Sequence, residues 1–246
     1  TLAGARTAAA PDMPPAGGVP AAPDARLLPE GYRSGLDAAA ASAPLDPAVV
    51  YEEIEAALAD GQAARAVLLL EAEQLHLGPC PEQSIGGARL ACALSGNVRR
   101  RAAADPGGSA VIEGLTALEN GAAQAAVDAL SRVGDPGGMA GAALRARLSE
   151  AASRLGPEIL QSRPDLDPAA LLERAIALDP AAPGLHAMLA RRYLAAGAPE
   201  AAFAVYDAAR AAFGDDAAAL AEAAELEARL RAVAPDFYRG KPPDSP

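Results

Sequence analysis

Three stretches of this chain share a spacing of small and large residues that is typical of paired helices. Each has a glycine, an alanine five positions later and a large apolar residue nine positions later. A glycine can end a helix in a left-handed turn, and an alanine lets a second helix pack closely on the first. The sets are Gly61, Ala66 and Leu70; Gly121, Ala126 and Leu130; and Gly197, Ala202 and Tyr206. The pattern predicts a repeated helical hairpin.

Composition also favours an all-α fold. Alanine, the strongest helix former, is abundant, whereas aromatic residues are 3% of the chain and Trp is absent. The formal net charge of -11 disfavours non-specific binding to nucleic acid or to anionic lipid. No apolar run in the sequence is long enough to cross a membrane. We therefore expect protein partners, no nucleic acid and no direct membrane span.

Proline and glycine divide the chain into three parts. Residues 1–44 are rich in Ala, Pro and Gly, and we expect an extended, mostly disordered arm. Helical spacing begins after Asp46-Pro47, because Asp is a good N-cap and Pro suits the first turn of a helix. We expect a helical repeat domain over residues 45–234 and a Pro-rich tail over residues 235–246.

Turn signals subdivide the repeat domain. Two Asp-Pro-Gly-Gly sequences, at 105–108 and 135–138, are expected to form turns, and residues 156–168 an irregular connection. One helix is expected over 84–104, with a possible break at Gly96-Asn97, and a last helix over 217–233. The other expected helices cover about 47–60, 63–77, 139–155, 169–178, 183–196 and 200–213. A further hairpin closed by Gly121 is expected to carry Val111, Leu115 and Leu118 on its first helix and Ala126, Leu130 and Val133 on its second.

Residues 169–214 resemble a tetratricopeptide repeat, a family built from 34-residue helix–turn–helix units. With Tyr193 on the aromatic position of the first helix, Leu189 and Ala190 match the usual pair of large and small residues before it. One period earlier, residues 171–180 resemble a second helix with its closing Asp-Pro. The further matches are Gly197 at the turn, Ala202 at the small position and Tyr206 at the second aromatic position.

The resemblance is weaker elsewhere. The units around Gly61 and Gly121 match only at their Ala and Leu positions, and in the clear repeat His186 replaces the usual Trp. Successive turn glycines are 60 and 76 residues apart rather than 34, which fits one additional hairpin between each pair. The resemblance implies a right-handed α-solenoid of about ten helices.

In this family the first helix of each hairpin lines a groove that binds a peptide or a helix. Members that clamp a C-terminal carboxylate carry Lys and Asn in the groove, and this chain does not. The resemblance therefore implies a small apolar groove, suited to an apolar helix or to the chain's own arm, with Arg191 and Arg192 at its edge or facing water. The expected lining residues are Gly184, Ala187, Met188, Arg191 and Leu194.

The chain has two cysteines, twelve positions apart. Cys80 lies between prolines, which indicates a loop, and Cys92 lies in a helical run. In a chain poor in other reactive groups this pair favours a disulfide, which contributes roughly 3 kcal/mol in a loop-closure model, and an oxidising compartment. We therefore expect a periplasmic location; two inert thiols would instead indicate the cytoplasm. A zinc site is disfavoured, because His76 is the sole nearby imidazole.

The sequence offers little catalytic chemistry. His186 occupies a helix-packing position, and His76 ends an apolar helix, where capping is its ordinary role. Nucleophile-elbow, phosphate-loop, zinc-protease and EF-hand patterns are missing from the sequence. We expect no enzyme, no cofactor and no metal.

These observations favour a non-catalytic scaffold or adaptor in a bacterial periplasmic or envelope assembly. One alternative is a fixed accessory subunit of an envelope machine, such as a periplasmic protein associated with the flagellar motor. The Pro-rich arm favours this alternative, because arms that become ordered on assembly are common in complexes. Another alternative is an assembly chaperone similar to the tetratricopeptide part of cytochrome c maturation proteins.

Overall fold

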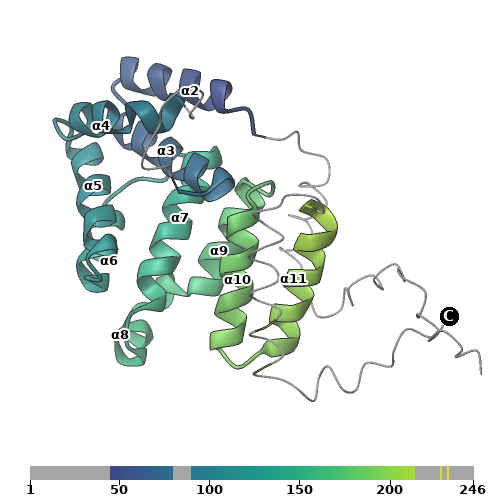
Figure 1. The fold of residues 1–246 in the computed structure, drawn as a ribbon. Helices are drawn as coiled ribbons and strands as arrows, with labels where there is room; N and C mark the ends of the chain where they lie inside the picture. Colours follow the sequence, from purple (N-terminus) through teal and green to yellow (C-terminus); the bar gives the residue numbers. More distant parts are fainter. Residues whose placement is uncertain (1–44, 80–89, 214–227, 229–231, 233–246) are drawn as a thin grey trace, which may run out of the picture.

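The computed structural model describes residues 45–79 and 90–213, together with Ala228 and Ala232 (Figure 1). These residues form ten α-helices and one 3-10 helix, and they contain no strand. The expected all-α class is therefore confirmed. None of the described helices combines the length and the apolarity that crossing a bilayer requires. The expected arm, tail and last helix lie outside the described residues, apart from the helical Ala228 and Ala232.

Apart from α3 and α4, which residues 78–89 separate, successive helices are joined by short connections. In chain order they are α2 (Pro47–Ala59), α3 (Ala63–Leu77), α4 (Leu90–Ala102), α5 (Pro106–Glu119), α6 (Ala123–Leu130), α7 (Gly138–Ser153), α8 (Pro157–Ser162), the 3-10 helix η1 (Pro164–Leu166), α9 (Pro168–Leu178), α10 (Pro183–Ala195) and α11 (Pro199–Phe213). α4 runs without a break through Gly96 and Asn97. The short helices α8 and η1 occupy the segment expected to be an irregular connection.

The three hairpins α2–α3, α5–α6 and α10–α11 are joined by turns with the same backbone geometry. Their glycines, Gly61, Gly121 and Gly197, have φ of +70°, +74° and +75°. Each glycine N–H donates to the carbonyl three residues back, over 3.4, 3.1 and 3.1 Å respectively. The following N–H donates to the carbonyl five residues before it, over 2.7, 2.8 and 2.9 Å. This pattern is a Schellman motif, whose left-handed residue glycine adopts most readily.

Small residues let the paired helices approach closely. Ala66, Ala126 and Ala202, five positions after the three turn glycines, are completely buried. Gly114 on α5 is also buried, and a Cβ atom there would lie 2.5 Å from Cγ of Leu130 on α6. The side chains of Leu70 and Leu130 fill the interior next to these contacts.

The two Asp-Pro-Gly-Gly sequences adopt different structures. Residues 135–137 connect α6 to α7 without a regular turn, with φ of +69° at Gly137, and Gly138, with φ of +51°, is the first residue of α7, so the expected turn is not found there. Residues 105–108 instead start α5: Asp105 is the N-cap, and its Oδ2 accepts a hydrogen bond from the Gly108 N–H at 2.8 Å. A Cβ atom at Gly108 would lie 2.4 Å from the carbonyl oxygen of Ala102, so this helix start packs directly against the end of α4. The expected turn at 105–108 was wrong.

Helix α3 is the centre of the described fold. It contacts α2, α4, α5, α7 and α10 (Figure 1), and every residue from Ala66 to Glu73 is buried. One core cluster surrounds α3, and a second lies among α9, α10 and α11. Helix α7 contributes to both, through Leu144 to the first and Ala146 to the second. α7 therefore connects the two halves of the described fold.

Candidate partner-binding site

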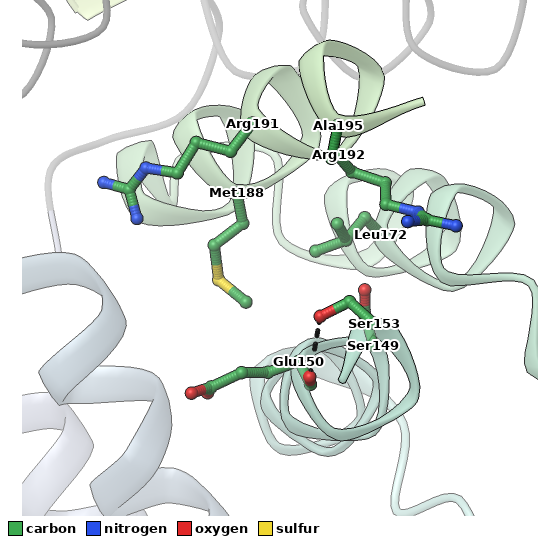
Figure 2. A pocket seen from close by; sticks show the side chains of 8 residues that line it. All are labelled: Ser149, Glu150, Ser153, Leu172, Met188, Arg191, Arg192 and Ala195. Carbon is green, nitrogen blue, oxygen red and sulfur yellow. Dashed lines mark hydrogen bonds between the residues drawn. The ribbon is translucent and has the colours of Figure 1, made fainter. Parts of the chain in front are cut away.

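A surface hollow lies between α7 and α10, with α9 as its floor (Figure 2). Its volume is about 680 Å³, open solvent included. Figure 2 shows Met188 directed from α10 toward α7, with Leu172 of α9 beside it. The lining residues are Ser149, Glu150 and Ser153 from α7, Leu172 from α9, and Met188, Arg191, Arg192 and Ala195 from α10.

The buried face of α10 determines which of its residues reach the hollow. Leu185, Leu189 and Ala190 are completely buried in the core shared with α9 and α11. At 3.6 residues per turn, Met188 and Arg192 fall to one side of this face, toward α7. The hollow is therefore a consequence of how α10 packs.

Hydrogen bonds fix the α7 side of the hollow. The buried Ser149 hydroxyl donates to the Pro168 carbonyl at 2.9 Å and so connects α7 to the first turn of α9. The Ser153 hydroxyl donates to the carbonyl of Glu150, one turn earlier, at 2.8 Å (Figure 2). Both hydroxyls are thus used within the fold.

The residues expected in the groove separate into different environments. Met188 and Arg191 line the hollow, whereas Leu194 packs partly buried against the α9–α11 core. Ala187 is half-buried and does not line the hollow. Gly184 faces α3 instead of a groove, because a Cβ atom there would lie 2.6 Å from the Leu75 carbonyl oxygen. The expectation for Gly184 was wrong.

Two aromatic positions of the expected repeat lie on α10 and α11. The Tyr193 hydroxyl donates to Oε1 of Glu173 on α9 at 2.8 Å. Burial and the neighbouring Glu173 carboxylate raise the pKa of Tyr193, so its hydroxyl keeps its proton. Tyr206 lies within α11, and its side chain is outside the described part of the chain. Tyr193 therefore joins α10 to α9 rather than facing the hollow.

A chain of ion pairs runs along α7 beside the hollow. Glu150 accepts hydrogen bonds from Arg147 at 2.9 Å and from Arg154 at 2.7 Å. Arg147 also pairs with Glu71 of α3 at 2.9 Å, and Glu71 pairs with Arg99 of α4 at 3.3 Å. Burial disfavours the charge of Arg147, but the Glu71 and Glu150 carboxylates outweigh it and raise the pKa of Arg147. The single carboxylate in the hollow is therefore already bound by two arginines.

Arg192 lines two hollows. The second, of about 500 Å³ with open solvent included, lies beside residues 160–168, where Arg163 is paired with Asp165 at 3.1 Å. Among the residues that the structure describes, none forms an ion pair or hydrogen bond with the Arg192 guanidinium. The Asp167 carboxylate lines the same second hollow but forms no ion pair with Arg192.

Both histidines lie where α3 meets the α9–α10 connection, and neither lines the hollow. His76 Nε2 is 3.6 Å from Oδ1 of Asp179, and its Nδ1 is 3.3 Å from the Ala72 carbonyl oxygen. Burial raises the pKa of Asp179, and His76 opposes that effect. His186 is completely buried with Nε2 3.0 Å from the Pro180 carbonyl oxygen, and burial lowers its pKa to about 4. These contacts give both imidazoles a packing role.

The expected disulfide falls partly outside the described residues. Cys92 lies on α4 with 8% of its surface exposed, and its Sγ is 3.9 Å from Oε2 of Glu73. Cys80 is outside the described ranges, so its pairing with Cys92 stays a prediction. Within those ranges, no three His, Cys, Asp or Glu residues are grouped as metal ligands would be.

Sequence reasoning missed the α7 side of the hollow. Ser149, Glu150 and Ser153 are polar residues at helical spacing in an Ala-rich segment, which was a usable signal for an exposed or functional face. Their distance in sequence from α10 hid the fact that the two helices line one hollow.

Comparison of this chain with protein-family models, with curated proteins and with solved structures gave no match in any of the three. The tetratricopeptide resemblance therefore rests on the residues of 169–214 themselves, and the function has to be argued from the chain's own geometry.

Proposed function

We propose that this chain is a non-catalytic scaffold that holds another protein at the hollow between α7 and α10. The observation that carries the proposal is the composition of that hollow. Met188 and Ala195 supply apolar surface beside the buried Leu172, and arginines lie around it. An apolar surface with a polar rim is the usual composition of a protein-binding patch.

The helical hairpins support the scaffold reading. Three Schellman turns with the same hydrogen bonds join closely packed helices, as the hairpins of a tetratricopeptide-like repeat require. The contacts of α3 with α7 and α10 add to nearest-neighbour packing and hold the hollow's walls on a fixed core. A site on rigid helices suits a scaffold, because little ordering is needed when the partner binds.

The compartment is part of the same proposal. A Cys80–Cys92 disulfide would stabilise the connection before α4 and favours the periplasm. In that compartment a single constant partner would indicate a fixed accessory subunit of an envelope assembly. Many unfolded clients would instead indicate an assembly chaperone.

The test is affinity purification of the full chain from the cells that make it, with and without reductant. Ala195 is exposed and lines the hollow, so Ala195→Trp fills the hollow without entering the core. The matched control is Ala125→Trp on the exposed face of α6. The proposal predicts that Ala195→Trp loses a partner that the wild type and Ala125→Trp both retain. Retention of every partner by Ala195→Trp would refute the site.

A further inference from the structure

We propose that the segment bound in the hollow is acidic, with an apolar side chain flanked by carboxylates. This inference rests on the proposed function and adds the chemistry of the partner. It follows from the order of apolar and charged groups across the hollow, which Figure 2 displays.

The centre of the hollow suits one apolar side chain. Leu172 forms the floor and is 2% exposed, so it is part of the core. Met188 is half-buried and packs against the same core, and its flexible thioether adapts to the shape of a partner side chain. Burying an apolar group here removes Met188 and Ala195 from water, which favours binding.

The charges around this centre favour carboxylates. In Figure 2, Arg191 and Arg192 are directed to opposite sides of the hollow, with Met188 between them. Glu150 is the one carboxylate in the lining, and Arg147 and Arg154 already bind it. Arg192 therefore gives the lining a positive charge that no described residue pairs with, on a chain whose formal net charge is -11.

An acidic segment fits this arrangement better than a neutral or a basic one. A carboxylate beside the apolar anchor would form a charge-assisted hydrogen bond with Arg192, whose guanidinium no other described residue binds. A basic segment would place like charges together. A nucleic acid is a poorer fit, because the net negative charge of the whole chain repels a long polyanion.

The experiment measures binding of defined peptides to the full-length chain by fluorescence anisotropy. The probe is a labelled 14-residue helical peptide of Leu, Ala and Glu, with matched peptides in which every Glu is Gln or Lys. The Glu peptide is expected to bind about five-fold tighter than the Gln peptide at low salt, and the difference is expected to shrink as salt screens the charges. The Lys peptide is expected to bind most weakly.

Two arginine variants connect the preference to the site. Arg192→Gln is expected to remove most of the advantage of the Glu peptide over the Gln peptide. Arg174→Gln is the matched control, because Arg174 is exposed on α9 and does not line the hollow. Met188→Ala is expected to weaken the Glu and Gln peptides equally, because both contain the apolar anchor.

The outcomes separate the two proposals. Equal binding of the Glu and Gln peptides, or an unchanged preference for the Glu peptide in Arg192→Gln, would refute the proposal that the partner segment is acidic. Neither result would contradict the proposed docking site. Tighter binding of a single-stranded DNA oligonucleotide than of the Glu peptide would also overturn it. If no peptide binds, recognition of a generic acidic segment is wrong, and the Ala195→Trp purification decides the docking site separately.

Discussion

Glu71 and Arg147 lie 76 residues apart in the sequence and form a nearly buried ion pair between α3 and α7. Two nitrogens of the Arg147 guanidinium, Nε and Nη2, lie 3.0 and 2.9 Å from Oε2 of Glu71. The side chain of Glu71 is 4% exposed, and Arg99 of α4 is 3.3 Å from its other oxygen. The Glu71 carboxylate on α3 therefore connects this central helix to both α4 and α7, and α7 forms one wall of the hollow.

Removing the charge of Glu71 is expected to destabilise the fold. Glu71→Gln leaves two arginines without their shared carboxylate, and we expect a loss of about 2–3 kcal/mol in the free energy of unfolding. The matched control is Glu113→Gln, because the Glu113–Arg132 pair is 60% exposed on both sides. That change is expected to cost less than about 0.5 kcal/mol. Equal losses in urea unfolding of the two variants would contradict the role assigned to Glu71.

A single methyl group is expected to disturb the α5–α6 hairpin. Gly114→Ala puts a Cβ atom 2.5 Å from Cγ of Leu130, so one helix has to shift, at a net cost of about 1–2 kcal/mol. Gly96→Ala on α4 is the control, because no atom lies within 4 Å of a Cβ atom there. Gly96→Ala is expected to raise the free energy of unfolding by up to about 1 kcal/mol, because Ala has a higher helix propensity than Gly. Thermal unfolding measures both, and a stabilised Gly114→Ala would show that the close contact is not there.

His186 is expected to make the fold sensitive to acid. Its pKa is about 4 in the folded chain against an ordinary value of 6.5, so the unfolded chain binds more protons between these values. The free energy of unfolding is therefore fully retained above pH 6.5 and decreases as the pH falls toward 4. Between pH 7 and pH 5 it decreases by about 2 kcal/mol. Asp179 acts in the opposite direction, because its raised pKa makes the folded chain bind a proton before the unfolded chain does.

Urea unfolding at pH 7 and pH 5 measures this effect in the wild type and in His186→Gln. The variant is expected to be less stable at pH 7 but to lose clearly less stability on acidification. The same loss in both chains would show that another group causes the acid sensitivity.

The cysteines are expected to resist alkylation until they are reduced. Because Cys92 is buried, labelling has to be done on the unfolded chain, where a free thiol cannot be hidden by packing. A Cys80–Cys92 disulfide predicts no mass increase without reductant and two alkyl groups after reduction. Two alkyl groups without reductant, in freshly purified native protein, would remove the argument for an oxidising compartment.

Local signals predicted most helix boundaries correctly. Asp46-Pro47 and Asp167-Pro168 start helices through side-chain hydrogen bonds of 2.9 and 3.0 Å to the Ala48 and Ala169 N–H groups. These signals act over three or four residues, so the sequence alone is sufficient to identify them.

Features that depend on contacts between distant segments could not be predicted in this way. The same four letters lead into a helix at both places, but α5 begins one residue after Asp105 and α7 three residues after Asp135, and Gly108 packs on the end of α4. The continuous burial of Ala66 to Glu73 requires neighbours on every side of α3, and helical periodicity predicts only one buried face. The groove expected from the sequence included residues of α10 only, because the contact between α10 and the distant α7 cannot be inferred from local spacing.

Site-specific crosslinking in living cells tests the scaffold proposal most directly. A photoreactive residue replaces Ala195 in the hollow or, as the control, Ala125 on α6, and the crosslinked peptides are sequenced. The account predicts that position 195 crosslinks to one segment of a partner protein, with acidic residues beside an apolar one, and that position 125 does not. Absence of a protein crosslink at 195, or identical products from both positions, would contradict it.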